Sequence, residues 1–412
     1  MLLLAFGLTQ YRQLFSLPFL NDDYVFLEKV RGLSFASLWQ RRDLTFGFYR
    51  PWSREFHYWA LMHAFGNSEL PYHLVNLGLW IALLVAYLSL AIDLLGVVNA
   101  RFALAGVLAS GIWGSPLLWV AGAQDLWMIL FGLFFLLSVR RGRLLLASLF
   151  LGLALLSKET AAVLPAIASA YLVTIGGKSL KEALLKSWPY WAILFAWSIF
   201  HPTFVGHLLG HSYQLAEVQT RPGMPAVATK TLLAQVNMDP LPRPEFGWAR
   251  ILPTACLGAA ILAALLLPAV LTPRKPSTQR HAEGSDTRAV RKFAAAWTVI
   301  GWIPFLAPSI GWHAYYGALG SLGFWVLVST FVGRAPKVAL VLFMALGLLR
   351  EARAATPSWD WGTDWYQQRA GWLLSSIRTR LRALHPSFPH GSRLFFARIP
   401  NNIGFLSGSG EN

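Results

Sequence analysis

The sequence of 412 residues is poor in charge and almost free of cysteine. Charged residues make up 13% of the chain, about half of the roughly 25% typical of a soluble protein. So few charges cannot cover the surface of a soluble enzyme of this length, and 55% of hydrophobic residues excludes a disordered chain. The one cysteine, Cys256, excludes an internal disulfide framework and a cysteine-rich metal site. These absences indicate a multi-span membrane protein.

The sequence also lacks the common nucleotide and hydrolase motifs. It has no Walker A loop, no GxSxG elbow and no dinucleotide-binding fingerprint. Its net charge of +16 lies largely in short stretches between apolar runs, as expected for the cytoplasmic loops of a membrane protein. We therefore predict membrane lipids rather than nucleic acid as partners.

About 20 apolar residues are needed to cross a bilayer. The run 143–176 is read as two spans around Lys158 and Glu159, because one helix of that length would be about 51 Å long, against a core of roughly 30 Å. An all-α polytopic protein with about eleven spans follows. The predicted spans are 1–20, 74–95, 101–120, 126–139, 143–157, 160–176, 188–205, 250–272, 293–308, 315–333 and 337–349.

Eleven spans with the N-terminus inside put every basic loop on the cytoplasmic side. These loops are 140–143, 178–186, 274–292 and 334–337. The transmembrane domain then covers 1–349, with extracytoplasmic loops at 21–73 and 206–249 and an extracytoplasmic tail at 350–412. Apolar spacing in 21–73 predicts amphipathic helices lying at the interface. The tail reads as a small, partly α/β segment with a strand at 393–399, the start of a truncated soluble domain.

The paired carboxylates Asp22 and Asp23 stand where the first span emerges. Two adjacent carboxylates at a membrane mouth suit a general base or an acceptor-binding group. A solvated helix cap is the alternative, since Asn and Asp cap helices well. We favour Asp23 as the base, because Asn21 and Asp22 are better placed to cap a helix beginning near Tyr24.

Other candidate site residues fall on the same predicted side. Arg50 and Arg54 can fork onto phosphate oxygens, or anchor lipid headgroups. His73 can bind a sugar, or simply pack. Lys158 and Glu159 form an ionisable pair between short apolar helices, for which a functional role is the default and a mutual ion pair the alternative. Asp125 lies in a similar outward turn, where its charge also suits a helix N-terminus.

In combination these motifs resemble the GT-C superfamily of polyprenyl-phosphate-sugar-dependent glycosyltransferases. The resemblance covers roughly residues 10–175 and rests on FLNDDYVFL, YRPWSREFHYWALMHAFGNSELPYHLVNL and LLSKETAAVLP in that order. It is similar to the branch of protein O-mannosyltransferase-like and TPR-associated mannosyltransferase-like proteins. It is weaker at WHAYYGALGSLGFWVL, where related proteins tend to carry an Arg-Tyr-Tyr-like pattern and His313 occupies the approach.

The resemblance implies an enzyme that moves a sugar, mannose or another hexose, from a polyprenyl-phosphate donor to a protein or glycolipid acceptor, usually with inversion. Asp22 or Asp23 would be the base. Arg50 and Lys158 would neutralise the leaving phosphate. The sugar pocket would take in His73, Asp125 and Glu159.

We expect an integral protein of the bacterial inner (plasma) membrane with an extracytoplasmic active site. No metal site and no definite cofactor are predicted, although a divalent cation stays open. A lipid-linked sugar flippase or another transporter is the rival reading. A transporter should show paired broken helices at the midplane, and the sequence shows no such pairing.

Overall fold

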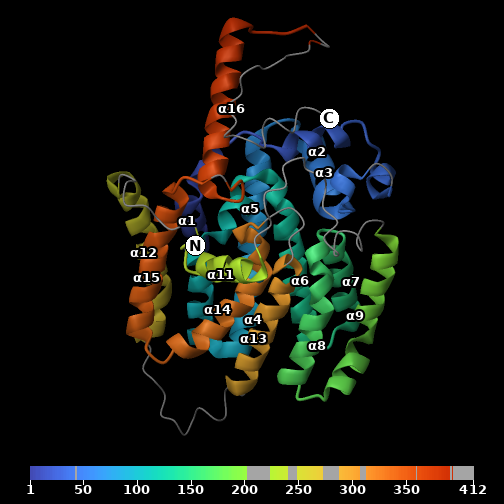
Figure 1. Cartoon of the computed structure of the whole chain (residues 1–412), viewed down its shortest axis with the longest axis vertical. Coiled ribbons are helices and arrows are strands. Elements are labelled where there is room, and N and C mark those ends of the chain that lie inside the picture. Colours follow the sequence, from blue (N-terminus) through green and yellow to red (C-terminus); the bar gives the residue numbers. More distant parts are fainter. Residues whose placement is uncertain are drawn as a thin grey trace.

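The computed structural model describes residues 1–41, 44–201, 223–239, 248–271, 287–306, 312–358, 360–389 and 392. Every regular element in these ranges is helical, which agrees with the all-α prediction (Figure 1). The α-helices are α1 (Leu2–Gln10), α2 (Asp22–Val30), α3 (His57–Phe65), α4 (Glu69–Ala109), α5 (Gly114–Leu118), α6 (Ala123–Arg140), α7 (Leu144–Leu155), α8 (Leu164–Thr174), α9 (Leu180–Phe200), α11 (Met224–Gln235), α12 (Trp248–Leu271), α13 (Thr287–Leu306), α14 (Ala318–Val332), α15 (Pro336–Ala355) and α16 (Asp364–Leu384).

Four helical stretches among the described residues are long and apolar enough to cross a membrane. They are Glu69–Ala109, Val120–Arg140, Ala249–Leu271 and Ala314–Val332, and two shorter apolar stretches are Leu144–Leu155 and Glu159–Thr174. These helices agree with an integral membrane protein. The first predicted span, 1–20, is instead a nine-residue α-helix followed by a 3₁₀ turn, Arg12–Phe15. The count of eleven spans stays a prediction.

Helix α4 contains the predicted span 74–95 and the first part of the predicted span 101–120, joined at Gly96. The backbone of Gly96 has φ 74° and ψ 163°, outside the helical region, so that α4 consists of two arms. A straight helix of 41 residues would be about 61 Å long. Instead, Asn76 near one end of α4 donates to the Val120 carbonyl at 3.0 Å, just beyond the other. Asp93, near Gly96, pairs with Arg140 at the opposite end of the bundle. The chain therefore reverses direction at Gly96.

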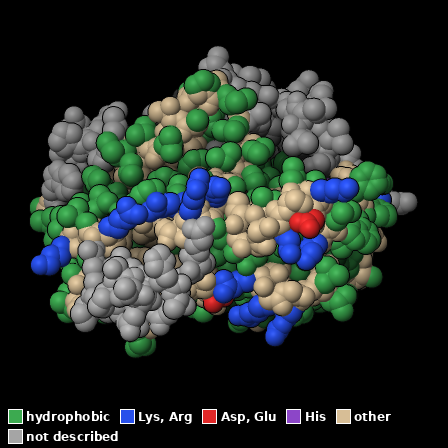
Figure 2. Space-filling view, turned by 90° about the horizontal axis from the view of Figure 1, so that it is seen from below, with side chains coloured by type: hydrophobic (Ala, Val, Ile, Leu, Met, Phe, Trp, Pro, Cys, Tyr) green, Lys and Arg blue, Asp and Glu red, His purple; other side chains and the backbone are tan. Residues whose placement is uncertain are grey.

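Several helices have their polar residues at the same end of the bundle. These residues are 125, 158–159, 201 and 313, at or next to the ends of α6, α8, α9 and α14. The contacts described below show that these ends meet. The opposite ends of these helices lead into the basic loops 141–143, 175–179 and 333–335. Figure 2, seen from below, shows Lys and Arg side chains gathered on that lower face with few acidic ones. The described parts of the basic loops therefore lie at the same end of the helix bundle.

A separate hydrophobic cluster holds the elements at the polar end. It joins α2, α3, the turn at 119–121 and the first turns of α16, through buried side chains that include Phe26, Tyr58, Trp119 and Tyr366. The amphipathic helices expected in 21–73 are α2 and α3, which lie near the upper end of the molecule in Figure 1. Their apolar faces are buried against this cluster, and α2 is thereby fixed over the ends of the bundle helices.

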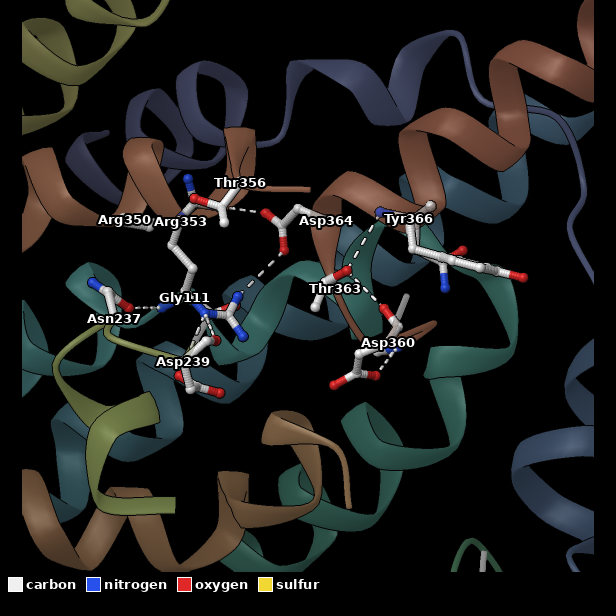
Figure 3. A network of polar contacts seen from close by, with 12 residues as sticks. Gly111, Asn237, Asp239, Arg350, Arg353, Thr356, Asp360, Thr363, Asp364 and Tyr366 are labelled. Atoms are coloured by element: carbon white, nitrogen blue, oxygen red, sulfur yellow. Dashed lines mark hydrogen bonds and ion pairs between the residues drawn. The ribbon is translucent and has the colours of Figure 1, made fainter. Parts of the chain in front are cut away.

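The predicted boundary at 349 does not match a helix end. Helix α15 continues to Ala355, because the polar residues that suggested an exit from the membrane are buried and paired (Figure 3). Arg350 donates to Gln10 at 2.8 Å and to Glu351 at 2.6 Å, while Arg353 donates to the backbone carbonyls of Asp239 and Gly111. The described part of the tail is otherwise helix α16 and its flanking turns. The predicted strand at 393–399 lies outside the described residues.

Candidate active site

The two aspartates begin helix α2. Asn21 precedes them with φ 47° and ψ −119°, a strained conformation of a kind that clusters at functional sites. Asp22 and Asp23 occupy the first turn, where the helix dipole favours negative charge. The helix therefore starts at Asp22 rather than near Tyr24, and the Asn21 side chain makes no capping hydrogen bond.

Asp23 is fully buried and fully engaged. Its Oδ1 accepts from the Tyr58 hydroxyl at 2.6 Å and from the Ala121 N–H at 2.9 Å, and its Oδ2 accepts from the Leu20 N–H at 2.8 Å. Burial raises the pKa of Asp23 to about 7, although these three hydrogen bonds oppose the rise. Asp23 thus links α2 to α3 and to the turn before α6.

Asp22 has a different environment. Its Oδ1 is buried and has no hydrogen-bond partner among the described residues. Burial raises the pKa of Asp22 to about 7, against the lowering effect of the Arg54 and Arg50 charges. A carboxylate oxygen left without a protein donor, close to two guanidinium groups, is suited to accept a proton from a bound molecule.

Arg50 is held by the loop before α8. Its Nε and Nη2 donate to Glu159 at 2.9 and 2.6 Å, and its Nη1 donates to the Gln124 side chain at 2.7 Å. His201 Nε2 lies 3.3 Å from the same glutamate. Arg50 leads into a π-helical turn, Pro51–Phe56, a kind of distortion that is frequent at functional sites. Four separate segments of the chain therefore contribute to the polar cluster around the Arg50 guanidinium.

Lys158 is the second cation of this end. Its Nζ lies 2.7 Å from both carboxylate oxygens of Asp125, and both side chains are nearly buried. The ammonium also stands over the rings of Tyr315 and Tyr316, at 5.3 and 5.2 Å from their centroids. Lys158 and Asp125, predicted separately, are direct partners.

His313 belongs to an aromatic group beside these tyrosines. Its Nδ1 contacts Asp360 Oδ1 at 2.5 Å, and its ring lies 3.7 Å from that of Trp361. Trp361 in turn meets Trp119, next to the turn that binds Asp23. His313, which we predicted to lie at the approach to the site, is thus in direct contact with Asp360 and Trp361.

Two predicted site residues are engaged elsewhere. Arg54 is almost completely buried and donates to Glu55 and to the carbonyls of Thr45 and Phe48. Its effect on Asp22 is through its charge. His73 is completely buried within α4, and neither of its ring nitrogens has a hydrogen-bond partner among the described residues. Burial therefore separates both side chains from solvent.

Sequence reasoning missed Tyr58, His57, Asp360 and Trp361. His57 Nδ1 accepts from Trp127 Nε1 at 3.2 Å, and burial lowers the pKa of His57 to about 4, so its proton is on Nε2 at neutral pH. Two patterns could have indicated these residues. His57 and Tyr58 directly follow the arginine-containing YRPWSREF segment, and Asp360 and Trp361 lie in the Trp- and Asp-rich run at 358–365.

Several buried polar atoms around these residues have no partner among the described residues. They are Asn21 Nδ2 and Oδ1, Asp22 Oδ1, Trp52 Nε1, His57 Nε2, Thr160 Oγ1 and His313 Nε2. Such atoms are costly unless a ligand or water satisfies them. Within the described chain, no group of three or more His, Cys, Asp or Glu is placed to hold a metal ion.

No protein-family model matches the sequence, and no curated protein matches it. Among solved structures, the chain is similar to the crystal structure of ArnT from Cupriavidus metallidurans bound to undecaprenyl phosphate, with 14% sequence identity and a TM-score of 0.46. The match covers 95% of this chain, which spans 65% of the length of that structure. A function for this chain depends on its own site residues.

Proposed function

We propose that the chain is an integral-membrane glycosyltransferase. It moves a sugar, mannose or another hexose, from a polyprenyl-phosphate donor to a hydroxyl of a protein or glycolipid acceptor. The observation that carries this proposal is the buried Asp22 oxygen, which has no partner among the described residues and feels the charge of Arg50. Arg50 in turn lies near Lys158, the second held cation. A free base with held cations at the same helix ends is what sugar transfer from a phosphate leaving group requires.

Asp22 acts as the base. Its carboxylate accepts the proton of the acceptor hydroxyl while the hydroxyl oxygen bonds to C1 of the sugar. The bond between C1 and the phosphate oxygen breaks, and its electron pair stays on the polyprenyl phosphate. Attack from the face opposite the phosphate inverts the configuration at C1. Asp23 holds α2 in register through Tyr58 and Ala121, which makes it a positioning residue.

Arg50 and Lys158 stabilise the negative charge that develops on the leaving phosphate. The acidic partners Glu159 and Asp125 keep each cation in place. A lysine ammonium has three donors, and contact with two Asp125 oxygens leaves at least one for a phosphate oxygen. The charge is thus placed before the reaction, as electrostatic catalysis requires.

The remaining unpartnered polar atoms suit the hydroxyl groups of a sugar. The Nε2–H of His57 and the Nε1–H of Trp52 are donors, and Thr160 can donate or accept. The donor's hydrocarbon tail can lie in the bilayer, so that no nucleotide site is needed. The basic loops at the opposite helix ends favour an extracytoplasmic site, in a bacterial inner membrane. No step in this scheme uses a metal ion.

The test compares two aspartate variants of the full chain. Asp22→Asn keeps the shape but removes the base, so transfer of labelled sugar from polyprenyl phosphate should fall about 100- to 10,000-fold with the melting temperature unchanged. Asp23→Asn replaces one acceptor by an NH₂ group facing a backbone donor, which should lower stability by about 1–3 kcal/mol as well as reduce transfer.

Asp93→Asn is the matched control, because Asp93 pairs with Arg140 at the other end of the bundle. It should leave transfer unchanged. Near-normal transfer in Asp22→Asn, measured with purified donor and acceptor, would show that the proposed mechanism is wrong.

A further inference from the structure

An open groove of about 950 Å³ lies between α2, the start of α4 and α16. One wall is α2 and another is α16, which rises from the same end of the molecule in Figure 1. The lining residues are Phe19, Tyr24, Leu27, Glu28, Arg31, Asn67, Glu69, Arg378, Thr379 and Arg382. This volume is at the upper end of the range typical of small-molecule sites.

The groove and the proposed base lie on different faces of α2. Tyr24, Leu27, Glu28 and Arg31 line the groove at helical spacing. Each residue turns the helix by about 100°, so Asp22 projects from the opposite flank of α2. The groove is therefore a site separate from the one that contains Asp22.

The charge of the groove favours an anion. Three arginines line it against two acidic side chains, Glu28 and Glu69. Arg31 pairs with Glu28 at 3.2 Å and Arg378 with Glu69 at 2.6 Å, and both arginines are largely exposed. Exposed ion pairs of this kind are weak, so their guanidinium groups can also fork onto a ligand phosphate. Arg382 adds a third guanidinium one turn from Arg378.

The position of the groove relative to α4 identifies the kind of molecule. Glu69 lines the groove and begins α4, and the next residue, Leu70, starts an exposed apolar stripe along that membrane-length helix. Leu74, Val85 and Ile92 continue this stripe at helical spacing and are also exposed. A headgroup in the groove would therefore have its acyl chains against α4.

We propose that this groove binds the phosphate-bearing headgroup of a membrane lipid at a site separate from the proposed base. The arginines hold the phosphate, and the stripe on α4 contacts the acyl chains. The binding of this lipid does not depend on the proposed function.

The test uses the full chain in phosphatidylcholine nanodiscs. The probe is dihexanoyl phosphatidic acid, a short-chain lipid with a phosphate monoester, and the reference is dihexanoyl phosphatidylcholine. Binding of the phosphatidic acid should be tighter by on the order of tenfold or more, and the double variant Arg378→Gln/Arg382→Gln should lose this difference. The double variant Arg369→Gln/Arg380→Gln removes the same charge from α16 outside the groove and should bind as the original chain does.

Equal losses in the two double variants would overturn the proposal, because the effect would then be general attraction. Inorganic phosphate binding as tightly as the lipid would also overturn it, because the acyl chains would contribute nothing. Asp22→Asn tests whether the groove is a separate site: this variant should bind phosphatidic acid as tightly as the original chain. A loss of binding in Asp22→Asn would overturn the proposal, because the lipid would then occupy the site of the proposed base. Since binding is measured without transfer, a failure of this proposal is distinguishable from a failure of the proposed function.

Discussion

Two adjacent aspartates on one helix have different partners. Asp23 has all its neighbouring donors on the protein, whereas Asp22 has an oxygen that meets none among the described residues. Both carboxyl groups have a pKa raised to about 7 by burial, and the Asp22 charge contributes to that of Asp23. Burial is the main cause of both shifts, so both carboxyl groups change protonation near neutral pH.

This titration predicts the pH dependence of transfer. A base must be ionised to accept a proton, and a pKa near 7 means that Asp22 is protonated below that pH. We expect kcat/KM to rise with pH to a plateau above an apparent pKa of about 7, and to fall about tenfold per pH unit below it. The measurement is a pH profile of transfer by the purified chain. A flat profile between about pH 5 and 8 would contradict the role of Asp22.

At the residue scale, the sequence predicts which side chains lie at the same end of the bundle but not which of them pair. The topology alone places Asp22, Arg50, Lys158 and Glu159 at the same helix ends, and the structure brings them together. From the sequence we favour Asp23 as the base, although one residue along a helix turns a side chain by about 100° and the pattern does not settle the choice. We propose Asp22 instead, because both oxygens of Asp23 already accept hydrogen bonds within the protein. The choice depends on Tyr58 and Ala121, which come from distant segments.

At the scale of elements, α4 depends on one glycine. Gly96 has φ 74° and ψ 163°, a region open almost only to glycine, although no atom crowds the place where a Cβ would stand. The cost of a side chain there is therefore conformational rather than steric. The two arms of α4 run between the end of the bundle near Ala121, which donates to Asp23, and the opposite end, where Asp93 pairs with Arg140.

Gly96→Ala should destabilise the chain by about 1–3 kcal/mol, because alanine must adopt that backbone conformation. Gly78→Ala is the matched control. Gly78 lies in the helical part of the same element with open space around it, so alanine there should be neutral or raise stability by about 0.5–1 kcal/mol. Thermal unfolding in detergent measures both. A melting temperature lowered equally by the two changes would mean that helix packing, and not the reversal, is affected.

The sequence predicts most of the helices, because an apolar run of membrane length can be recognised from hydropathy alone. It failed where a polar residue is buried rather than exposed. Arg350 and Arg353 suggested the end of a span, but they are neutralised inside the protein by Glu351, Asp364 and Asp239, and α15 continues past them. Burial of charge by distant partners is invisible in a local hydropathy pattern.

At the scale of the whole molecule, charge and chemistry occupy opposite ends. The Lys- and Arg-rich face of Figure 2 terminates the helices whose other ends carry Asp125, Lys158 and His313. An excess of Lys and Arg in short loops marks the cytoplasmic side. The site residues are therefore expected outside.

Reporter fusions test this orientation. Fusions at Gly142 and Gly284 should read cytoplasmic, and one at Gly223 should read external, because the first two follow basic loops and the third lies in the loop 206–249. An external signal at Gly142 would reverse the orientation and remove the basis for an extracytoplasmic site.

The reversal at Gly96 and the direction of α6 and α14 place the basic face and the proposed base at opposite ends of the helix bundle. If the basic face is cytoplasmic, the proposed reaction needs a donor whose sugar has already crossed the membrane on its lipid. The energy for transfer would then be stored in the sugar–phosphate bond of that donor. Each turnover would leave one emptied carrier in the outer leaflet, so the rate at which carriers are refilled and returned would limit the total output.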